Sequence, residues 1–228
     1  MTDDMKMKET SVAEMVHEVR NPLTTVKGLL QLLKPYLVMI EKDRYADIAI
    51  SEIERADELL SEYLRTDQSF ASIQRPVCVN TLLEEMMLLF EREANVHRIR
   101  FSTQFDPDFP KVNVCRSELK QVLVNLVKNA VEALIEVKEN RVRTISFETY
   151  VQGNRTILMV KDNGIGMSQS TLAQLFIPFY TEKSYGTGLG LSICKKVIEK
   201  HGGLVTVESE INKGTTFQIS LPTPTHIK

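Results

Sequence analysis

The fold is indicated by two glycine-rich segments in the last third of the chain, Asp162-Asn163-Gly164-Ile165-Gly166-Met167 and Gly186-Thr187-Gly188-Leu189-Gly190-Leu191. The apolar run 157–160 precedes the first segment, so Asp162 is expected where a strand ends. A carboxylate in that place can accept a hydrogen bond from the amino group of adenine, and Gly164 and Gly166 let the backbone approach a flat ring. The alternative is a tight turn capped by Asp-Asn-Gly, which many proteins contain.

The second glycine-rich segment opens a helix expected from about residue 189 to 201. Residues without side chains leave backbone N–H groups accessible at the positive end of a helix, where a polyphosphate is stabilised. Roughly twenty residues, among them Tyr180 and Lys183, separate the two segments. We interpret them as a lid over a nucleotide, with Lys183 near the terminal phosphate. A surface loop that runs into a helix is the alternative.

Another helix is expected from residue 117 to about 137, and its apolar side is predicted to face the core. Its other side is a polar stripe at steps of three and four, made of Glu118, Gln121, Asn125, Asn129 and Glu132. A carboxamide oxygen is a hard, neutral ligand that suits Mg²⁺ bridging phosphates. The alternative is a merely solvated helix face.

The first third of the chain predicts a helical hairpin. One apolar seam alternates spacings of four and three and consists of Val12, Val16, Val19, Leu23, Val26, Leu30 and Leu33. Pro35 is expected to end this helix, and a second apolar run follows over residues 46–63. Because two helices bury too little apolar surface, we expect two chains to pair residues 8–68 into a homodimeric four-helix bundle.

The remaining pattern predicts a second domain of mixed type. We expect domain bounds of 1–68 for the hairpin, 69–76 for a polar linker and 77–228 for the second domain. In the second domain Asn80 is expected to cap a helix that ends at Glu93, and strands are expected near 99–104, 144–151, 156–161, 204–209 and 215–221. The expected fold class is therefore α+β, with a helical hairpin followed by an α/β sandwich that carries its helices on one face of a mixed sheet.

Composition excludes several classes of partner. The 228 residues are 43% hydrophobic and 25% charged, with a formal charge of −2, so no general attraction to nucleic acid or to an anionic membrane is expected. The three cysteines lack the paired spacings of zinc sites, and no stretch approaches the length of a membrane span. We therefore expect a cytoplasmic chain without membrane contact.

Taken together, these motifs resemble the catalytic core of the bacterial sensor histidine kinases of two-component signalling. Residues 17–22, His-Glu-Val-Arg-Asn-Pro, are similar to that family's phosphoacceptor box. Its asparagine box is matched by residues 125–129, its two glycine boxes by 162–166 and 186–190, and its phenylalanine box by 176–179. The resemblance covers about residues 11–221. The runs 27–33 and 181–183 are further similar to kinases that start sporulation in endospore-forming bacteria.

The resemblance implies an ATP-binding fold of the gyrase, Hsp90 and histidine kinase type. It implies ATP and Mg²⁺ as cofactors, with Asn129 as the metal ligand, Asp162 holding adenine, and Thr215 or Thr216 as a second contact on the adenine side. The residues expected at the nucleotide are Asn125, Lys128, Asn129, Asp162, Gly164, Gly166, Tyr180, Lys183, Thr187, Gly188, Leu189, Gly190, Thr215 and Thr216.

The resemblance also implies a reaction and its partners. His17 is expected to attack the γ-phosphorus of ATP, with Glu18 orienting the imidazole and accepting its proton. Asn21 is expected to steady the phosphorylated ring or to position water for the reverse reaction. The phosphate would then pass to an aspartate of a response-regulator receiver protein, and a small inhibitor protein docked on the hairpin is a further partner. The chain could be the cytoplasmic part of a membrane-bound sensor.

Two other functions stay open from the residues alone. An ATP-driven conformational clamp would account for the nucleotide site but would leave His17 unexplained. A non-catalytic dimeric scaffold that keeps ATP only for folding would require a damaged site, and none of the motifs departs visibly from the pattern. Likewise, His17 could be a helix-surface histidine without a role, and only its surrounding motif argues against that.

Overall fold

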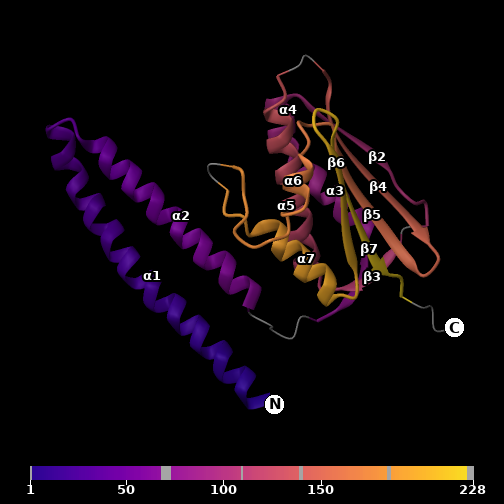
Figure 1. Cartoon of the computed structure of the whole chain (residues 1–228), viewed down its shortest axis with the longest axis horizontal. Helices are drawn as coiled ribbons and strands as arrows, with labels where there is room; N and C mark the ends of the chain where they lie inside the picture. The colour runs from indigo at the N-terminus through magenta and orange to yellow at the C-terminus, as the bar shows by residue number, and fades with distance from the viewer. Residues whose placement is uncertain (1, 68–72, 109, 139–140, 184–185, 225–228) are drawn as a thin grey trace. The chain divides into compact units, whose positions relative to one another are not determined.

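The computed structural model describes residues 2–67, 73–108, 110–138, 141–183 and 186–224 (Figure 1). Within the first two helices, side chains are described for residues 18–54, 56, 57 and 60. The chain forms two compact units, Met1–Ala71 and Ser72–Lys228. None of the helices in the described ranges is long and apolar enough to cross a bilayer.

The first unit is a hairpin of two long helices, α1 (Thr2–Met39) and α2 (Asp43–Asp67). Three ion pairs at 2.5 to 2.7 Å join them: Arg20 with Asp57, Lys27 with Glu54, and Lys34 with Asp47. The basic partners recur every seven residues along α1, which is the spacing of a helix seam. Because these side chains are partly exposed, the pairs contribute little to stability, but they fix which residues of α2 lie beside α1.

Pro35 does not end the first helix, contrary to the prediction from sequence, because α1 continues through it. A proline removes a single helical hydrogen bond, and this one lies near the end of a long helix. The helix instead closes at Glu41, which has a left-handed φ of 55°. There the N–H of Lys42 donates to the carbonyl of Leu37 at 2.8 Å, a Schellman-type closure made without the usual glycine.

The hairpin leaves much of its apolar surface in solvent. Among the side chains described in this unit, only Ala46 is buried. Three residues of the expected seam, Val19, Val26 and Leu33, are 41%, 47% and 52% exposed. A helix pair of this kind leaves part of its apolar face in solvent, which favours burial of that face by a partner.

The second unit contains a five-stranded mixed sheet in the order β2-β4-β5-β7-β6. Its strands are β2 (Ile99–Gln104), β4 (Arg143–Gln152), β5 (Arg155–Asp162), β7 (Gly214–Pro222) and β6 (Leu204–Glu210). β2 and β4 pair in parallel, and the other neighbouring strands are antiparallel. A separate antiparallel pair, β1 (Arg75–Cys78) with β3 (Lys111–Val114), was not expected, and Arg75 and Pro76 fall inside the range expected as linker.

Helices cover one face of this sheet (Figure 1). They are α3 (Val79–Leu89), α4 (Glu91–His97), α5 (Arg116–Ile135), the single turn α6 (Gln169–Leu172) and α7 (Gly190–Lys200). One apolar core lies between the helices and the sheet, and its fully buried members include Leu123, Leu126, Phe147, Leu158 and Ile219. This arrangement confirms the α/β sandwich predicted for the second domain.

The prediction that Asn80 caps a helix is wrong. Asn80 lies within α3, and its side chain makes long-range hydrogen bonds instead. Its Oδ1 accepts from the Thr149 hydroxyl at 2.7 Å, and its Nδ2 donates to the carbonyl of Asp106 at 2.8 Å. The expected single helix to Glu93 is also divided at Phe90 into α3 and α4. A buried polar network has therefore taken the side chain that a local capping rule assigned to the helix end.

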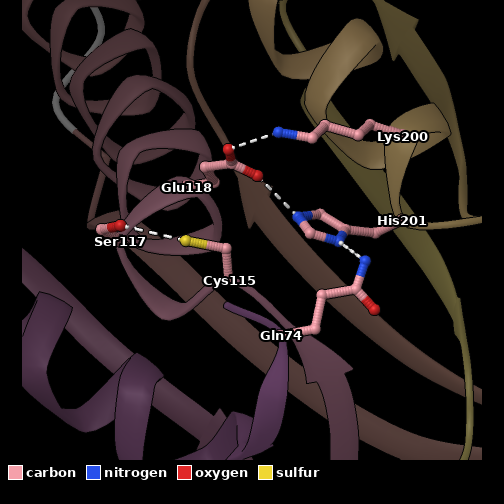
Figure 2. Close-up of polar contacts among 6 residues, drawn as sticks. All are labelled: Gln74, Cys115, Ser117, Glu118, Lys200 and His201. Carbon is pink, nitrogen blue, oxygen red and sulfur yellow. Dashed lines mark hydrogen bonds and ion pairs between the residues drawn. The ribbon is translucent and has the colours of Figure 1, made fainter. Parts of the chain in front are cut away.

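A buried histidine joins the carboxyl-terminal end of α7 to the start of α5 (Figure 2). His201 directly follows α7, and its side chain is 1% exposed. Its Nε2 lies 2.8 Å from a Glu118 carboxylate oxygen at the start of α5, and its Nδ1 lies 3.3 Å from the Gln74 amide nitrogen. Because a carboxylate only accepts, Nε2 carries the hydrogen and Nδ1 accepts from Gln74 in the neutral ring. Lys200 donates to the other Glu118 oxygen at 2.7 Å.

Glu118 should make this end of the second unit sensitive to acid. Burial raises the pKa of Glu118, but the hydrogen bonds from Lys200 and His201 outweigh that effect and hold its pKa below the ordinary value. Stability from Glu118 is therefore present above the ordinary glutamate pKa of about 4.3 and is lost as pH falls through the lower folded-state pKa. Urea unfolding should show Glu118→Gln to be less stable than wild type at pH 7, with a gap that closes in acid. Glu84→Gln, at an exposed site on α3, is the control. A gap that widened in acid would contradict this account.

Candidate functional site

Asp162 is the last residue of β5 and is 5% exposed. One of its oxygens accepts from the N–H of Gly164 at 2.8 Å. Burial raises the pKa of Asp162 to about 6, although the backbone N–H groups of Gly164 and Thr215 and the charges of Arg141 and Lys183 act to lower it. The structure thus places a largely desolvated carboxylate at the strand end, as the sequence predicted, with acceptor capacity left for a ligand amino group.

The turn after Asp162 depends on Gly166, which the sequence placed beside the adenine. Gly166 has a φ of +66°, and a Cβ there would lie 2.0 Å from the carbonyl oxygen of Glu210. Gly164 lies between Asp162 and Gly166 in the turn, and its carbonyl accepts from the Arg141 guanidinium at 2.9 Å. Arg141 also donates to the carbonyl of Asn212 at 2.7 Å, so it ties the turn to the β6–β7 hairpin. The main chain at this turn packs closer than a side chain would allow.

The register of β5 and β7 separates the two threonines predicted on the adenine side. Thr215 pairs directly with Asp162, and Thr216 pairs with Lys161. Since successive side chains of a strand point to opposite faces, Thr215 shares the helix-covered face with Asp162 and Thr216 does not. The Thr215 hydroxyl lies 2.9 Å from the Ser209 hydroxyl. Of the two, Thr215 is the one positioned beside Asp162.

The polar face of α5 is not a merely solvated one. Asn125 Nδ2 donates to the carbonyl of Gly190 at 3.4 Å, so it links α5 to the first turn of α7. Asn129 Oδ1 accepts from the Lys183 ammonium at 3.1 Å. Lys128 is exposed on the same helix, without a contact to this group of residues among those described. The two carboxamides therefore face the lid and α7, and the Mg²⁺ role predicted from the stripe stays a prediction.

The predicted lid lies between the two glycine-rich segments, over residues 168–185, and its described part, 168–183, is held by its own side chains. The Glu182 carboxylate accepts from the Thr171 hydroxyl at 2.7 Å and from the Tyr180 hydroxyl at 3.0 Å. Tyr180 lies within the lid and donates to a carboxylate of the same segment, and its predicted contact with the nucleotide stays a prediction. Gly188 has a φ of +68°, and a Cβ there would lie 2.5 Å from the carbonyl carbon of Phe179. From this lid, Lys183 reaches α5 through its contacts with Asn129 and Glu132.

The amino-terminal end of α7 is the helix end at which the sequence predicts phosphate binding. Gly190 is the first residue of the helix, and Leu189 before it is buried. The Leu189 N–H points to the Thr187 hydroxyl at 3.3 Å. With 11 residues, α7 is long enough for its first N–H groups and its dipole to stabilise an anion.

The hairpin residues of the predicted reaction lie in α1. Glu18 and Asn21 are exposed. The side chain of His17 lies outside the described part of the structure, although its helix is described. Since the two units are separate bodies, the geometry that would join His17 to the nucleotide site is not a property of either unit alone.

The structure adds three residues that sequence reasoning did not assign to the site: Glu132, Arg141 and Glu182. Glu132 forms an ion pair with Lys183, and Glu182 fixes the lid. Glu132 belongs to the polar stripe, so its helical spacing was a usable signal. Arg141 and Glu182 lie in irregular segments, and their contacts depend on tertiary structure that local patterns do not show.

The donor atoms fit magnesium and ATP. The described residues contain no group of three or more histidine, cysteine or acidic side chains that could hold a metal by itself. Mg²⁺ commonly binds with one or two protein ligands and completes its shell with water and phosphate oxygens. The Asn129 oxygen already faces a cation, the Lys183 ammonium, so it can ligate a metal held mainly by phosphates.

Comparison with known proteins agrees with this geometry. Residues 115–225 match the family "Histidine kinase-, DNA gyrase B-, and HSP90-like ATPase", and residues 7–69 match the "His Kinase A (phospho-acceptor) domain". The chain is 38% identical over 223 residues to sporulation kinase C of Bacillus subtilis (strain 168), which covers 96% of this chain and 50% of that protein. The chain belongs to the histidine kinases.

Solved histidine kinase structures are also similar to this chain. The catalytic domain of histidine kinase ThkA is 34% identical with a TM-score of 0.59 and covers 66% of this chain and 95% of that one. ThkA in complex with the response regulator protein TrrA is 28% identical with a TM-score of 0.65 and covers 96% of this chain and 63% of that one. The ATPase family match implies that the second unit binds ATP. The kinase spans half the length of sporulation kinase C.

Asp162 should lower the stability of the histidine kinase above pH 6, and the sequence predicts that this carboxylate holds adenine. Because folding raises the pKa of Asp162 to about 6, the ionised carboxylate destabilises the folded state. This loss of stability is complete above pH 6 and fades toward pH 4. Asp162→Asn should raise the free energy of unfolding at pH 7.5 by on the order of 3 kcal/mol, and with it the thermal unfolding temperature. The same variant should abolish ATP binding. Both should be measured on the same preparation, by calorimetric scanning and titration. An asparagine variant with lower stability at pH 7.5 would contradict this interpretation.

Proposed function

We propose that this chain phosphorylates its own His17 from ATP and passes the phosphate to an aspartate of a response-regulator receiver protein. The observation that carries the proposal is the presence, in one chain, of a phosphoacceptor-domain match over the helix of His17 and an ATPase match over the unit of Asp162 and Asn129. A conformational clamp would need the second unit only. A scaffold would not need the contact between Lys183 of the lid and Asn129 of α5.

The proposed chemistry assigns each residue a task. Nε2 of His17 forms a bond to the γ-phosphorus as the bond to the β-phosphate oxygen breaks, and ADP leaves. The ring becomes positively charged, and Glu18 accepts the proton from Nδ1. Mg²⁺ on Asn129 would neutralise phosphate charge. The N–H groups at the start of α7 hold the polyphosphate, and Asp162 accepts from the adenine amino group.

The proposed partners follow from the comparisons and from the hairpin surface. A receiver protein is supported by the ThkA structure, which is a complex with the response regulator protein TrrA. Sporulation as the pathway is supported by the similarity to sporulation kinase C. A small inhibitor protein docked on the hairpin and a place in the cytoplasm, alone or below a membrane-bound sensor, stay predictions from the resemblance.

Incubation with γ-labelled ATP and Mg²⁺ tests the reaction. We expect a label on the wild-type chain that is lost in acid and survives alkali, which is the behaviour of a phosphohistidine. His17→Ala should abolish it because the acceptor is gone, and Asn129→Ala should abolish it because the metal is not held. His97→Ala, at the end of α4, should keep it. A label that stays on the His17→Ala chain, or that survives acid, would overturn the proposal.

A homodimer through the hairpin is proposed because its seam is exposed in the single chain. Light scattering should return about twice the chain mass of 26.0 kDa at micromolar concentration. Val26→Glu places a charge in the seam and should shift the mass toward the monomer, since a buried unpaired charge is unfavourable. Leu88→Glu, at a site that is 72% exposed in the second unit, should leave the mass unchanged. A wild-type monomer would reject the dimer.

A further inference from the structure

The Lys183 ammonium lies on the part of α5 where the metal is proposed to bind. Its Nζ donates to Asn129 Oδ1 at 3.1 Å and forms an ion pair with the Glu132 carboxylate. Asn129 and Glu132 are three residues apart on one helix, so both side chains reach the same point. The two oxygens therefore converge on one cation, and in this structure that cation belongs to the protein.

Lys183 is held there from both sides. The lid supplies one support, because Glu182 accepts from Thr171 and Tyr180, and the Lys183 N–H donates to the Thr181 hydroxyl at 3.1 Å. The other support is Glu132 itself, since its carboxylate balances the ammonium charge. The Lys183 and Glu132 side chains are 42% and 35% exposed, so water screens the pair in part and its strength is modest.

The Lys183 ammonium and a magnesium ion bound to Asn129 would repel each other. Mg²⁺ binds oxygen at about 2.0 to 2.1 Å, so a metal on Asn129 Oδ1 would lie at most about 5 Å from an ammonium that keeps its present 3.1 Å contact with that oxygen. Like charges that close oppose each other. Occupancy by one cation therefore weakens occupancy by the other.

We propose that Glu132 is a positioning residue that holds Lys183 on Asn129 as an internal competitor of Mg²⁺. Loading of the metal with the nucleotide then detaches Lys183, and the ammonium becomes free to face the phosphates. Glu132 thereby sets how much Mg²⁺ is needed to load the site. This inference rests on the proposed function, because it takes Asn129 as the metal ligand and Lys183 as the lid cation.

The test is a magnesium titration of nucleotide binding by the whole chain. ATP with a fluorophore on its ribose is bound first in EDTA and then with rising Mg²⁺, and the half-saturating Mg²⁺ concentration is read from fluorescence anisotropy. Glu132→Gln keeps the shape of the side chain and removes its charge. We expect the half-saturating Mg²⁺ to fall about two- to fivefold, as suits the loss of a partly exposed ion pair. Binding in EDTA should not weaken, because this variant keeps both Asn129 and Lys183.

Two further variants separate a local competitor from a general charge effect. Glu136→Gln removes an exposed negative charge at the C-cap of α5, four residues after Glu132, and should leave the Mg²⁺ requirement unchanged. Lys183→Met should lower the Mg²⁺ requirement as Glu132→Gln does, and the double variant should add nothing further, because both changes remove one contact.

The outcomes are distinct. A raised Mg²⁺ requirement in Glu132→Gln would make Glu132 a metal ligand and overturn the inference, and so would an unchanged requirement in a variant whose thermal unfolding matches wild type. Equal effects of Glu132→Gln and Glu136→Gln would also overturn it. A wild-type chain that bound no labelled ATP at any Mg²⁺ concentration would instead reject the proposed function.

Discussion

The packing of α5 against the sheet positions the groups of the candidate site. Its apolar side contributes Leu119, Leu123 and Leu126 to the core, and each is almost fully buried. A helix is rigid over its length, so burial of one side fixes the direction of the other. Asn125, Asn129 and Glu132 therefore point toward α7 and the lid without needing loops to hold them. Burial of the apolar side of α5 therefore sets the direction in which its polar side chains point.

The strand end at Asp162 shows the opposite relation between packing and chemistry. Here a charged side chain is taken out of water, and burial works against its ionised form. The surrounding backbone N–H groups and Arg141 reduce that penalty without removing it. A protein chosen only for stability would replace this carboxylate, so its presence in the core is itself a sign of a binding task.

Sequence alone predicted the elements whose signals are local. The apolar run before Asp162 and the helical stripe of Asn125 and Asn129 required only periodicity, and the structure places Asp162 at a strand end and both asparagines on one helix, as expected. Pro35 and Asn80 misled because local rules competed with tertiary ones: a long helix tolerates a proline near its end, and buried partners claimed the amide. The contact of Lys183 with Glu132 spans 51 residues of chain, and no pattern within either segment specifies it.

The ion pairs of the hairpin have a consequence for solution conditions. Arg20, Lys27 and Lys34 meet acidic partners at matched positions along α2, so sliding one helix by a single turn would separate every pair at once. Such partly exposed pairs weaken as dissolved ions screen them over about 10 Å at 0.1 M. Raising ionic strength should thus relax the lengthwise registry of the hairpin well before it reduces helix content, and buffers of different salt would sample different alignments of the same two helices.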